Sequence, residues 1–147
     1  PRHKKIISSL KNLNVKIKFI TDGDVSAAIW AARSSGPYDM LMGIGAAPEG
    51  VITAAALRGI GGVFEGRLVF RSDEEEKRAE KMVDDDLERL WDAKDLCKSD
   101  DAVFAASGVC DGYLPGVIFG EDQIQTFSEL IDVKSGNVSR YDKVHPL

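Results

Sequence analysis

Three stretches in the first sixty residues have the hydrophobic spacing of α-helices. Between His3 and Asn14 the apolar residues recur every three or four positions, which predicts a surface helix with one buried stripe. Residues 25–32 (VSAAIWAA) are apolar nearly all round, so we expect a helix that packs on more than one side. Residues 47–60 (APEGVITAAALRGI) predict another helix, with few polar positions.

Strand patterns alternate with these helices. Residues 15–20 (VKIKFI) place apolar side chains at every second position, the period of a strand with one wet face near a sheet edge. Residues 38–45 (YDMLMGIG) and 63–70 (VFEGRLVF) are further strand candidates. The order strand, helix, strand, helix predicts an α/β fold with a largely parallel sheet.

The second half of the chain predicts one long helix and a closing pair of strands. Residues 73–91 carry apolar residues on one side of a mainly charged helix, and residues 101–109 form a buried strand candidate. Looser alternation through 123–145, broken at Ser135-Gly136-Asn137, predicts an antiparallel hairpin. The apolar positions of the predicted helix are Ala79, Met82, Val83, Leu87, Leu90 and Trp91. Those of the predicted hairpin are Phe127, Leu130, Val133, Val138, Tyr141 and Val144.

Composition limits the classes of protein that fit. At 147 residues and 44% hydrophobic the chain supports one domain, spanning 1–147. A formal net charge of −5 offers no basic excess for nucleic acid or an anionic membrane. No apolar run approaches the roughly 20 residues of a bilayer span, and a secretory signal is missing, so we expect a cytoplasmic protein, or a plastid one in a photosynthetic eukaryote. The start on Pro-Arg-His suggests a piece of a longer polypeptide.

Two loops carry the candidate chemistry, because each follows a predicted strand at the position where open α/β sheets bind ligands. The first is Asp22-Gly23-Asp24 and the second spans residues 43–50 (GIGAAPEG). Glycines in the second loop let the backbone approach a ligand, and the helix that follows directs free N–H groups at the same space, which suits a phosphate. Pro48 and Glu49 fit the first turn of that helix.

Structural interpretations of these residues stay open. The DGD segment is also typical of a turn whose second Asp caps a helix, and Glu49 of a carboxylate matched to the helix dipole. A dinucleotide fingerprint would need a glycine where Pro48 stands, so an NAD-dependent enzyme is disfavoured. The acidic runs 74–76 and 84–86 are interpreted as the solvated face of the long helix. His3 and His145 have no companion nucleophile and Cys97 and Cys110 no metal-ligand spacing, so none of the four is assigned a role.

Longer motifs carry a family resemblance. The segments DGDVSAAI and LMGIGAAPEGVITAAALRGIGG, with PRHKKII, GRLVF and VFAASGVCDG in the same order, resemble class II fructose-1,6-bisphosphatases over the whole chain. The wording GIGAAPEGV is most similar to the cyanobacterial type that also takes sedoheptulose-1,7-bisphosphate. This resemblance implies a lithium-sensitive-phosphatase-like sandwich of sheet and helix layers, of which residues 1–147 would be the C-terminal αβ half.

The resemblance also implies the chemistry. It implies hydrolysis of the 1-phosphate of a sugar bisphosphate with Mn²⁺ or Mg²⁺, in gluconeogenesis or the Calvin cycle. Arg2 then matches a phosphate contact, Asp22, Gly23 and Asp24 the sugar contacts, Ala46 a further substrate contact, and Glu49 a metal ligand. The other metal carboxylates would come from a missing N-terminal half, so this chain alone should be a poor catalyst. We expect a homo-oligomer. The alternative is a non-catalytic module that binds a sugar phosphate or a nucleotide.

Overall fold

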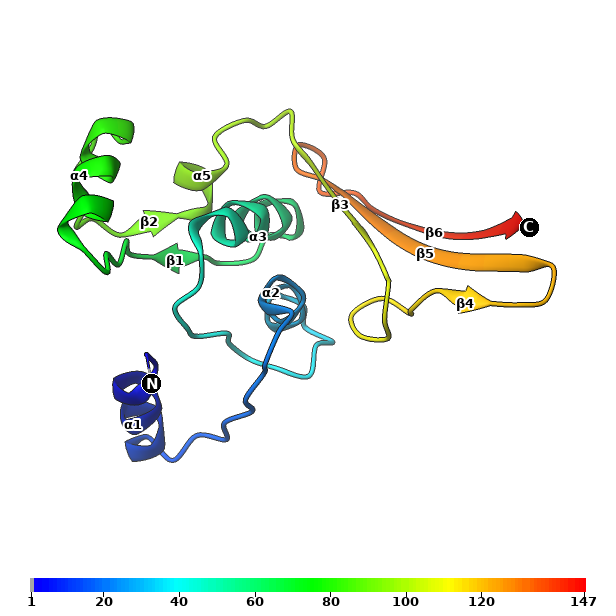
Figure 1. The fold of residues 1–147 in the computed structure, drawn as a ribbon, viewed down its shortest axis with the longest axis horizontal. Coiled ribbons are helices and arrows are strands. Elements are labelled where there is room, and N and C mark those ends of the chain that lie inside the picture. The colour runs from blue at the N-terminus through cyan, green and yellow to red at the C-terminus, as the bar shows by residue number, and fades with distance from the viewer. Residues whose placement is uncertain (1) are drawn as a thin grey trace.

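The computed structural model describes residues 2–147, whose helices and strands are arranged around two central helices and a long β-hairpin (Figure 1). The helices are α1 (Lys4–Asn12), α2 (Asp24–Ala32), α3 (Ala47–Ile60), α4 (Asp73–Met82) and α5 (Ala93–Leu96). The strands are β1 (Glu65–Gly66), β2 (Trp91–Asp92), β3 (Val103–Ser107), β4 (Ile118–Phe119), β5 (Gln123–Asp132) and β6 (Val138–Pro146). None of the helices within residues 2–147 combines the length and hydropathy of a transmembrane span.

Helices and sheet occur together, as an α/β fold requires, but the expected parallel sheet is wrong. Among residues 2–147 every assigned strand pair is antiparallel: β1 pairs with β2, and β5 pairs with β3, β4 and β6. The predicted hairpin is confirmed as β5 and β6, with Gln123 opposite Pro146 and Ile131 opposite Val138. Only five residues, 133–137, connect these strands, and so short a connection joins antiparallel neighbours.

The three N-terminal helices are confirmed within a few residues of their predicted ends. Helix α2 begins after Gly23, whose φ of 75° lies in the left-handed region that glycine tolerates. Helix α3 has Pro48 in its first turn and ends at Gly61 in the left-handed conformation of a C-cap. Local end signals therefore predicted these boundaries well.

The long helix over 73–91 is wrong in its second half, since α4 ends at Met82. Val83 is extended, and the aspartates that follow bond their own backbone: Asp85 accepts from the Asp86 N–H and Asp86 from the Glu88 N–H. Such local bonds compete with helical ones. The acidic run 84–86 consequently lies beyond the helix and not on its polar face.

Two predicted strands are absent from the sheets of the described chain. Residues 15–20 and 38–45 carry no strand assignment, and 63–70 is reduced to β1. A strand needs a hydrogen-bonding neighbour, and residues 15–20 and 38–45 have none assigned within 2–147. Apolar side chains in both segments remain exposed, among them Phe19 at 65% and Met42 at 50% of their surface.

The core lies where α2 and α3 pack on β3 and β5. Its central cluster joins Ile29, Ala56, Phe104 and Ile131, one from each element. Gly59 of α3 faces Ile131 so closely that an added β-carbon would lie 2.3 Å from the Ile131 Cγ2 atom. Glycine at this position allows the helix and the sheet to meet.

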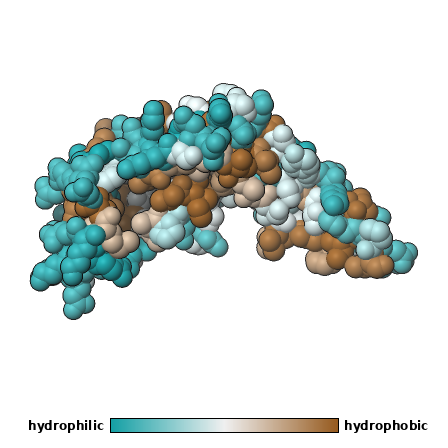
Figure 2. Space-filling model, turned by 90° about the horizontal axis from the view of Figure 1, so that it is seen from above, coloured by the Kyte–Doolittle hydropathy of each residue, from teal (hydrophilic) through white to brown (hydrophobic). Residues whose placement is uncertain are grey.

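Much of the chain lies outside this core. The described chain exposes 10891 Å², whereas a compact monomer of 16.0 kDa exposes roughly 7,400 Å² by the usual size scaling. The molecule is curved in the view of Figure 2, and apolar side chains are visible on its concave side and along the narrow part at the right. The folded chain therefore leaves an unusually large area uncovered.

Candidate functional site

The turn before α1 and the glycine loop before α3 are in direct contact. The Ile44 N–H donates to the His3 Nε2 atom over 2.8 Å, and a β-carbon at Gly43 would lie 3.6 Å from the same ring. Arg2 adjoins this contact, with its Nε atom 3.3 Å from His3 Nε2. The predicted phosphate contact is thereby held beside the predicted phosphate loop.

The DGD turn faces the same loop. A β-carbon built on Gly45 would lie 3.3 Å from the Asp24 Oδ2 atom, while Asp24 Oδ1 accepts from the Val25 N–H. Asp22 is exposed, and its Oδ1 atom accepts from the Gly23 N–H over 2.7 Å. One oxygen of Asp24 is thus engaged with the backbone at the start of α2, and the other is directed toward the loop.

Ala46 and Glu49 lie at the start of α3. Ala46 is the extended N-cap residue, and no side chain caps the free backbone N–H groups of the first turn. Such uncapped amides, at the positive end of the helix dipole, form a suitable seat for an anion. Glu49 is exposed in this first turn, so its carboxylate is open to solvent and to a ligand.

The residues present fit a metal site only in part. Among residues 2–147 there is no group of three or more His, Cys, Asp or Glu side chains close enough to hold a metal ion. Glu49 supplies one hard oxygen ligand of the kind that Mg²⁺ and Mn²⁺ prefer. A complete site would need carboxylates from outside the described chain.

The acidic residues at the start of α4 include one, Glu75, that hydrogen-bonds the backbone at the helix N-terminus. Ser72 accepts from the Glu75 N–H, and Glu75 returns a bond to the Arg71 N–H over 2.9 Å. These contacts cap the helix, a role that the sequence pattern did not predict. Glu74 and Glu76 are exposed, in agreement with the interpretation of the run 74–76 as a solvated face. Asp85, in the second acidic run, pairs with Arg89.

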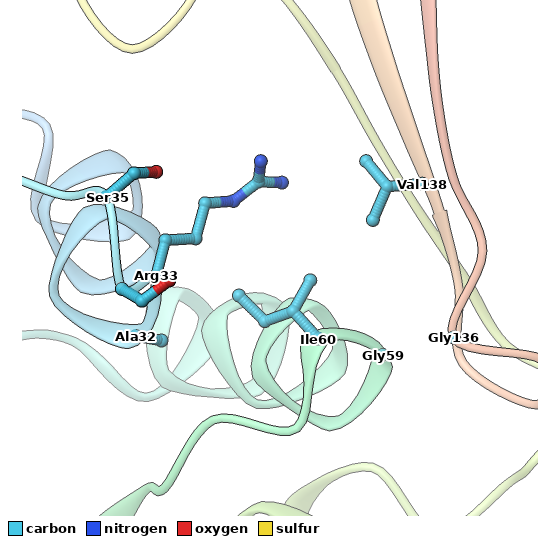
Figure 3. A pocket seen from close by; sticks show the side chains of 8 residues that line it. Ala32, Arg33, Ser35, Gly59, Ile60, Gly136 and Val138 are labelled. Atoms are coloured by element: carbon cyan, nitrogen blue, oxygen red, sulfur yellow. The ribbon is translucent and has the colours of Figure 1, made fainter.

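A pocket of about 510 Å³, shown in Figure 3, is lined by none of the predicted site residues. It is bounded by the ends of α2 and α3 and by the turn between β5 and β6. The Arg33 side chain extends across it from the end of α2, with Ile60 and Val138 on its other sides. This pocket and the candidate chemistry are therefore in different places, and the loops are the better candidate because they gather carboxylates and free amides.

A buried charge beside this pocket escaped sequence reasoning. Glu129 of β5 is fully buried, and it accepts from Arg33 Nη2 over 2.9 Å, from Arg140 Nε over 2.8 Å and from the Tyr113 hydroxyl. Burial, followed by the hydrogen bond to Glu129, raises the pKa of Tyr113 to about 12. Alternation along β5 is the signal that could have found it, because Glu129 lies on the same face as the buried Ile131.

This cluster is an anchor between α2 and the sheet. Three donors from different parts of the chain occupy both oxygens of Glu129, so the carboxylate is satisfied without a ligand. The Arg33 guanidinium also lies 5.4 Å from the centre of the Tyr113 ring. The Arg33 Nε atom is buried without a partner, which leaves one polar atom of the anchor unsatisfied.

Comparisons with known proteins show similarity over nearly the whole chain. A family model described as bacterial fructose-1,6-bisphosphatase, glpX-encoded, matches residues 1–145. A D-fructose 1,6-bisphosphatase class 2/sedoheptulose 1,7-bisphosphatase of Gloeobacter violaceus is 37% identical over 161 residues, covering 99% of this chain and 46% of the relative. The relatives of that name from Trichodesmium erythraeum and Prochlorococcus marinus are also 37% identical, with 46% and 47% of their lengths covered. The chain spans about half the length of the curated relatives that it matches.

Proposed function

Since the chain belongs to the family of bacterial, glpX-encoded fructose-1,6-bisphosphatases, we propose that it supplies the substrate-binding half of a metal-dependent sugar-bisphosphate 1-phosphatase. Fructose 1,6-bisphosphate and sedoheptulose 1,7-bisphosphate, the substrates in the names of its relatives, are the substrates to test. Gluconeogenesis and the Calvin cycle are the pathways that would use this reaction.

One observation carries the proposal. Three segments far apart in the sequence, at Arg2, at Asp22-Gly23-Asp24 and at residues 43–49, meet through the His3–Ile44 bond and the Asp24–Gly45 approach. They bring together a guanidinium, carboxylates and free helix amides. A sugar bisphosphate needs these same groups: cations and amides for its phosphates, and acceptors for its hydroxyls.

Each residue then has a role. Asp22 and Asp24 accept from sugar hydroxyls, and the left-handed Gly23 keeps the turn between them tight. The backbone from Ala46 onward binds a phosphate and Arg2 assists. Glu49 would be one ligand of Mg²⁺ or Mn²⁺, which when bound supplies charge neutralisation at the phosphate.

We further propose that residues 1–147 are the C-terminal αβ domain of the longer enzyme, in a lithium-sensitive-phosphatase-like fold. The uncovered surface of the chain and its share of the relatives' length support this proposal. The other half would then bring the remaining carboxylates to Glu49. A homo-oligomer in the cytoplasm stays a prediction.

Reconstitution tests the proposal. The chain is mixed with the N-terminal half of the Gloeobacter violaceus relative, and phosphate release from fructose 1,6-bisphosphate is measured with Mn²⁺. We expect activity in the mixture only, and a loss of about a hundredfold or more for Glu49→Gln because a metal ligand is removed. Glu74→Gln, a matched carboxylate in the first turn of α4, should keep full activity.

Two results would contradict this assignment: an inactive mixture, or full activity with Glu49→Gln. The rival proposal is a non-catalytic sugar-phosphate or nucleotide module, and it is supported by the uncapped start of α3, which suits an anion without a metal. Calorimetry separates the two proposals. A binding module should bind a sugar phosphate or a nucleotide tightly without metal and without the other half.

A further inference from the structure

His3 links the start of α1 to the glycine loop across 41 residues of sequence. Its Nε2 atom accepts the Ile44 N–H over 2.8 Å in a partly buried contact, and its ring lies against Gly43. The Ile44 N–H is directed at Nε2, so this nitrogen is the acceptor of the contact, and Arg2 Nε lies 3.3 Å from the same atom.

The rest of α1 offers little to hold it in place. No residue of α1 is buried, and the extended residues 15–20 that follow belong to no strand. The position of Arg2 relative to the glycine loop therefore depends heavily on the His3 contact. A flexible arginine loses side-chain and backbone entropy when it binds, and a fixed turn lowers that cost.

We infer that His3 is a positioning residue of the proposed substrate site. Its bond to the Ile44 N–H sets the separation between the Arg2 guanidinium and the amides at the start of α3. Two anion-binding groups at a set separation match a ligand with two phosphates better than a ligand with one. His3 thus favours bisphosphates, through a role that rests on the proposed function.

Two substitutions separate the hydrogen bond from the side chain that makes it. His3→Gln keeps an acceptor near the place of Nε2, because its amide Oε1 reaches a similar distance from the backbone. His3→Leu keeps bulk but removes the acceptor. Calorimetry is done on the reconstituted pair with Ca²⁺ in place of Mg²⁺, so that the ligand is bound without being hydrolysed. The Kd for fructose 1,6-bisphosphate should rise about tenfold for His3→Leu, the value of one hydrogen bond, and about twofold or less for His3→Gln.

Three readouts distinguish positioning from a general loss of structure. The Kd for fructose 6-phosphate should change about twofold or less in His3→Leu, since one phosphate does not need the separation. Hydrogen exchange of the Ile44 amide should quicken in His3→Leu and not in His3→Gln. Combining His3→Leu with Arg2→Gln should cost less than the sum of the two single changes, because His3 acts through Arg2.

The experiment distinguishes failure of the proposed function from failure of the inference about His3. If the wild-type pair does not bind fructose 1,6-bisphosphate, the proposed function is wrong. If it binds and His3→Leu binds equally well, or if His3→Leu weakens both sugar phosphates by the same factor, the inference about His3 alone is overturned. Should His3→Leu not fold, as judged by circular dichroism, His3→Asn replaces it, since its shorter amide does not reach the Ile44 N–H.

Discussion

The α2–α3–sheet core and the proposed substrate site are held together in different ways. The core closes over Ile29, Ala56, Phe104 and Ile131 and is cross-linked by the buried Glu129. In the site, none of the residues 2–24 or 38–49 is fully buried. Its segments meet through the hydrogen bond from the Ile44 N–H to His3 and through the close approach of Asp24 to Gly45.

This contrast separates stability from chemistry. Apolar burial and a satisfied ion cluster determine whether the chain folds, while the site keeps its polar groups open for a ligand. Changes in the core should therefore unfold the protein, and changes at the site should leave it folded. The predictions below test this division, beginning with the largest effect.

Removing the buried charge should have the largest effect on stability. Glu129→Leu leaves Arg33, Arg140 and the Tyr113 hydroxyl without their acceptor, so the free energy of unfolding should fall by about 3 to 5 kcal/mol. Urea unfolding measures this loss. The exposed Glu121→Leu should change stability by about 0.5 kcal/mol or less. A loss below about 1 kcal/mol for Glu129→Leu would show that the cluster is not an anchor.

The second largest loss of stability should follow from adding one methyl group at the contact between α3 and β5. Gly59→Ala places a β-carbon 2.3 Å from Ile131 Cγ2, so α3 and β5 must move apart, at a cost of about 1 to 3 kcal/mol. Thermal unfolding monitored by circular dichroism measures the change. Gly112→Ala, whose β-carbon meets no atom within 4 Å, is the matched control. Equal melting temperatures for the two variants would contradict the packing.

The Tyr113 hydroxyl makes a contribution to stability that depends on pH. Its pKa is raised to about 12 in the folded protein, above the ordinary value of 10.0, so the protonated form favours folding. That contribution is complete below pH 10 and is lost as the pH rises toward 12. The stability difference between wild type and Tyr113→Phe should therefore shrink over this range in urea titrations, with the exposed Tyr141→Phe as control. A constant difference would rule out the linkage.

Of these variants, Glu49→Gln at the proposed site should lower the free energy of unfolding least. Glu49→Gln removes an exposed first-turn charge, so only the interaction with the helix dipole, about 0.3 to 1 kcal/mol, is lost. Urea unfolding of the chain alone should confirm this small change. A loss comparable to that of Glu129→Leu would mean that Glu49 is structural, and the division between core and site would fail.

Sequence patterns predicted those elements whose signals are local. Helices α2 and α3 were recognised from their apolar faces and end residues, and the β5–β6 hairpin from its alternation and its central turn. The extended residues 15–20 and 38–45 were misassigned because strand formation depends on a partner that the sequence pattern does not reveal.

The charged anchor was missed for a related reason. The apolar residues Phe127, Leu130 and Val133 defined the alternation in this stretch, whereas its buried residues are Glu129, Ile131 and Val133. A glutamate is usually exposed, and its burial depends on donors that lie 11 to 96 residues away. His3 was likewise left without a role, since only the fold brings Ile44 to it.

The most direct test of the central claim is to find where a sugar bisphosphate binds. The ¹⁵N-labelled chain, paired with the unlabelled N-terminal half of the relative, is titrated with fructose 1,6-bisphosphate while its amide signals are followed by NMR, with Ca²⁺ in place of Mg²⁺ so that the ligand is not hydrolysed. We predict that the largest shifts fall on residues 2–3, 22–24 and 44–49. Shifts concentrated at Arg33, Gly59 and Gly136 around the pocket, or no saturable shifts at all, would contradict the assignment of the site.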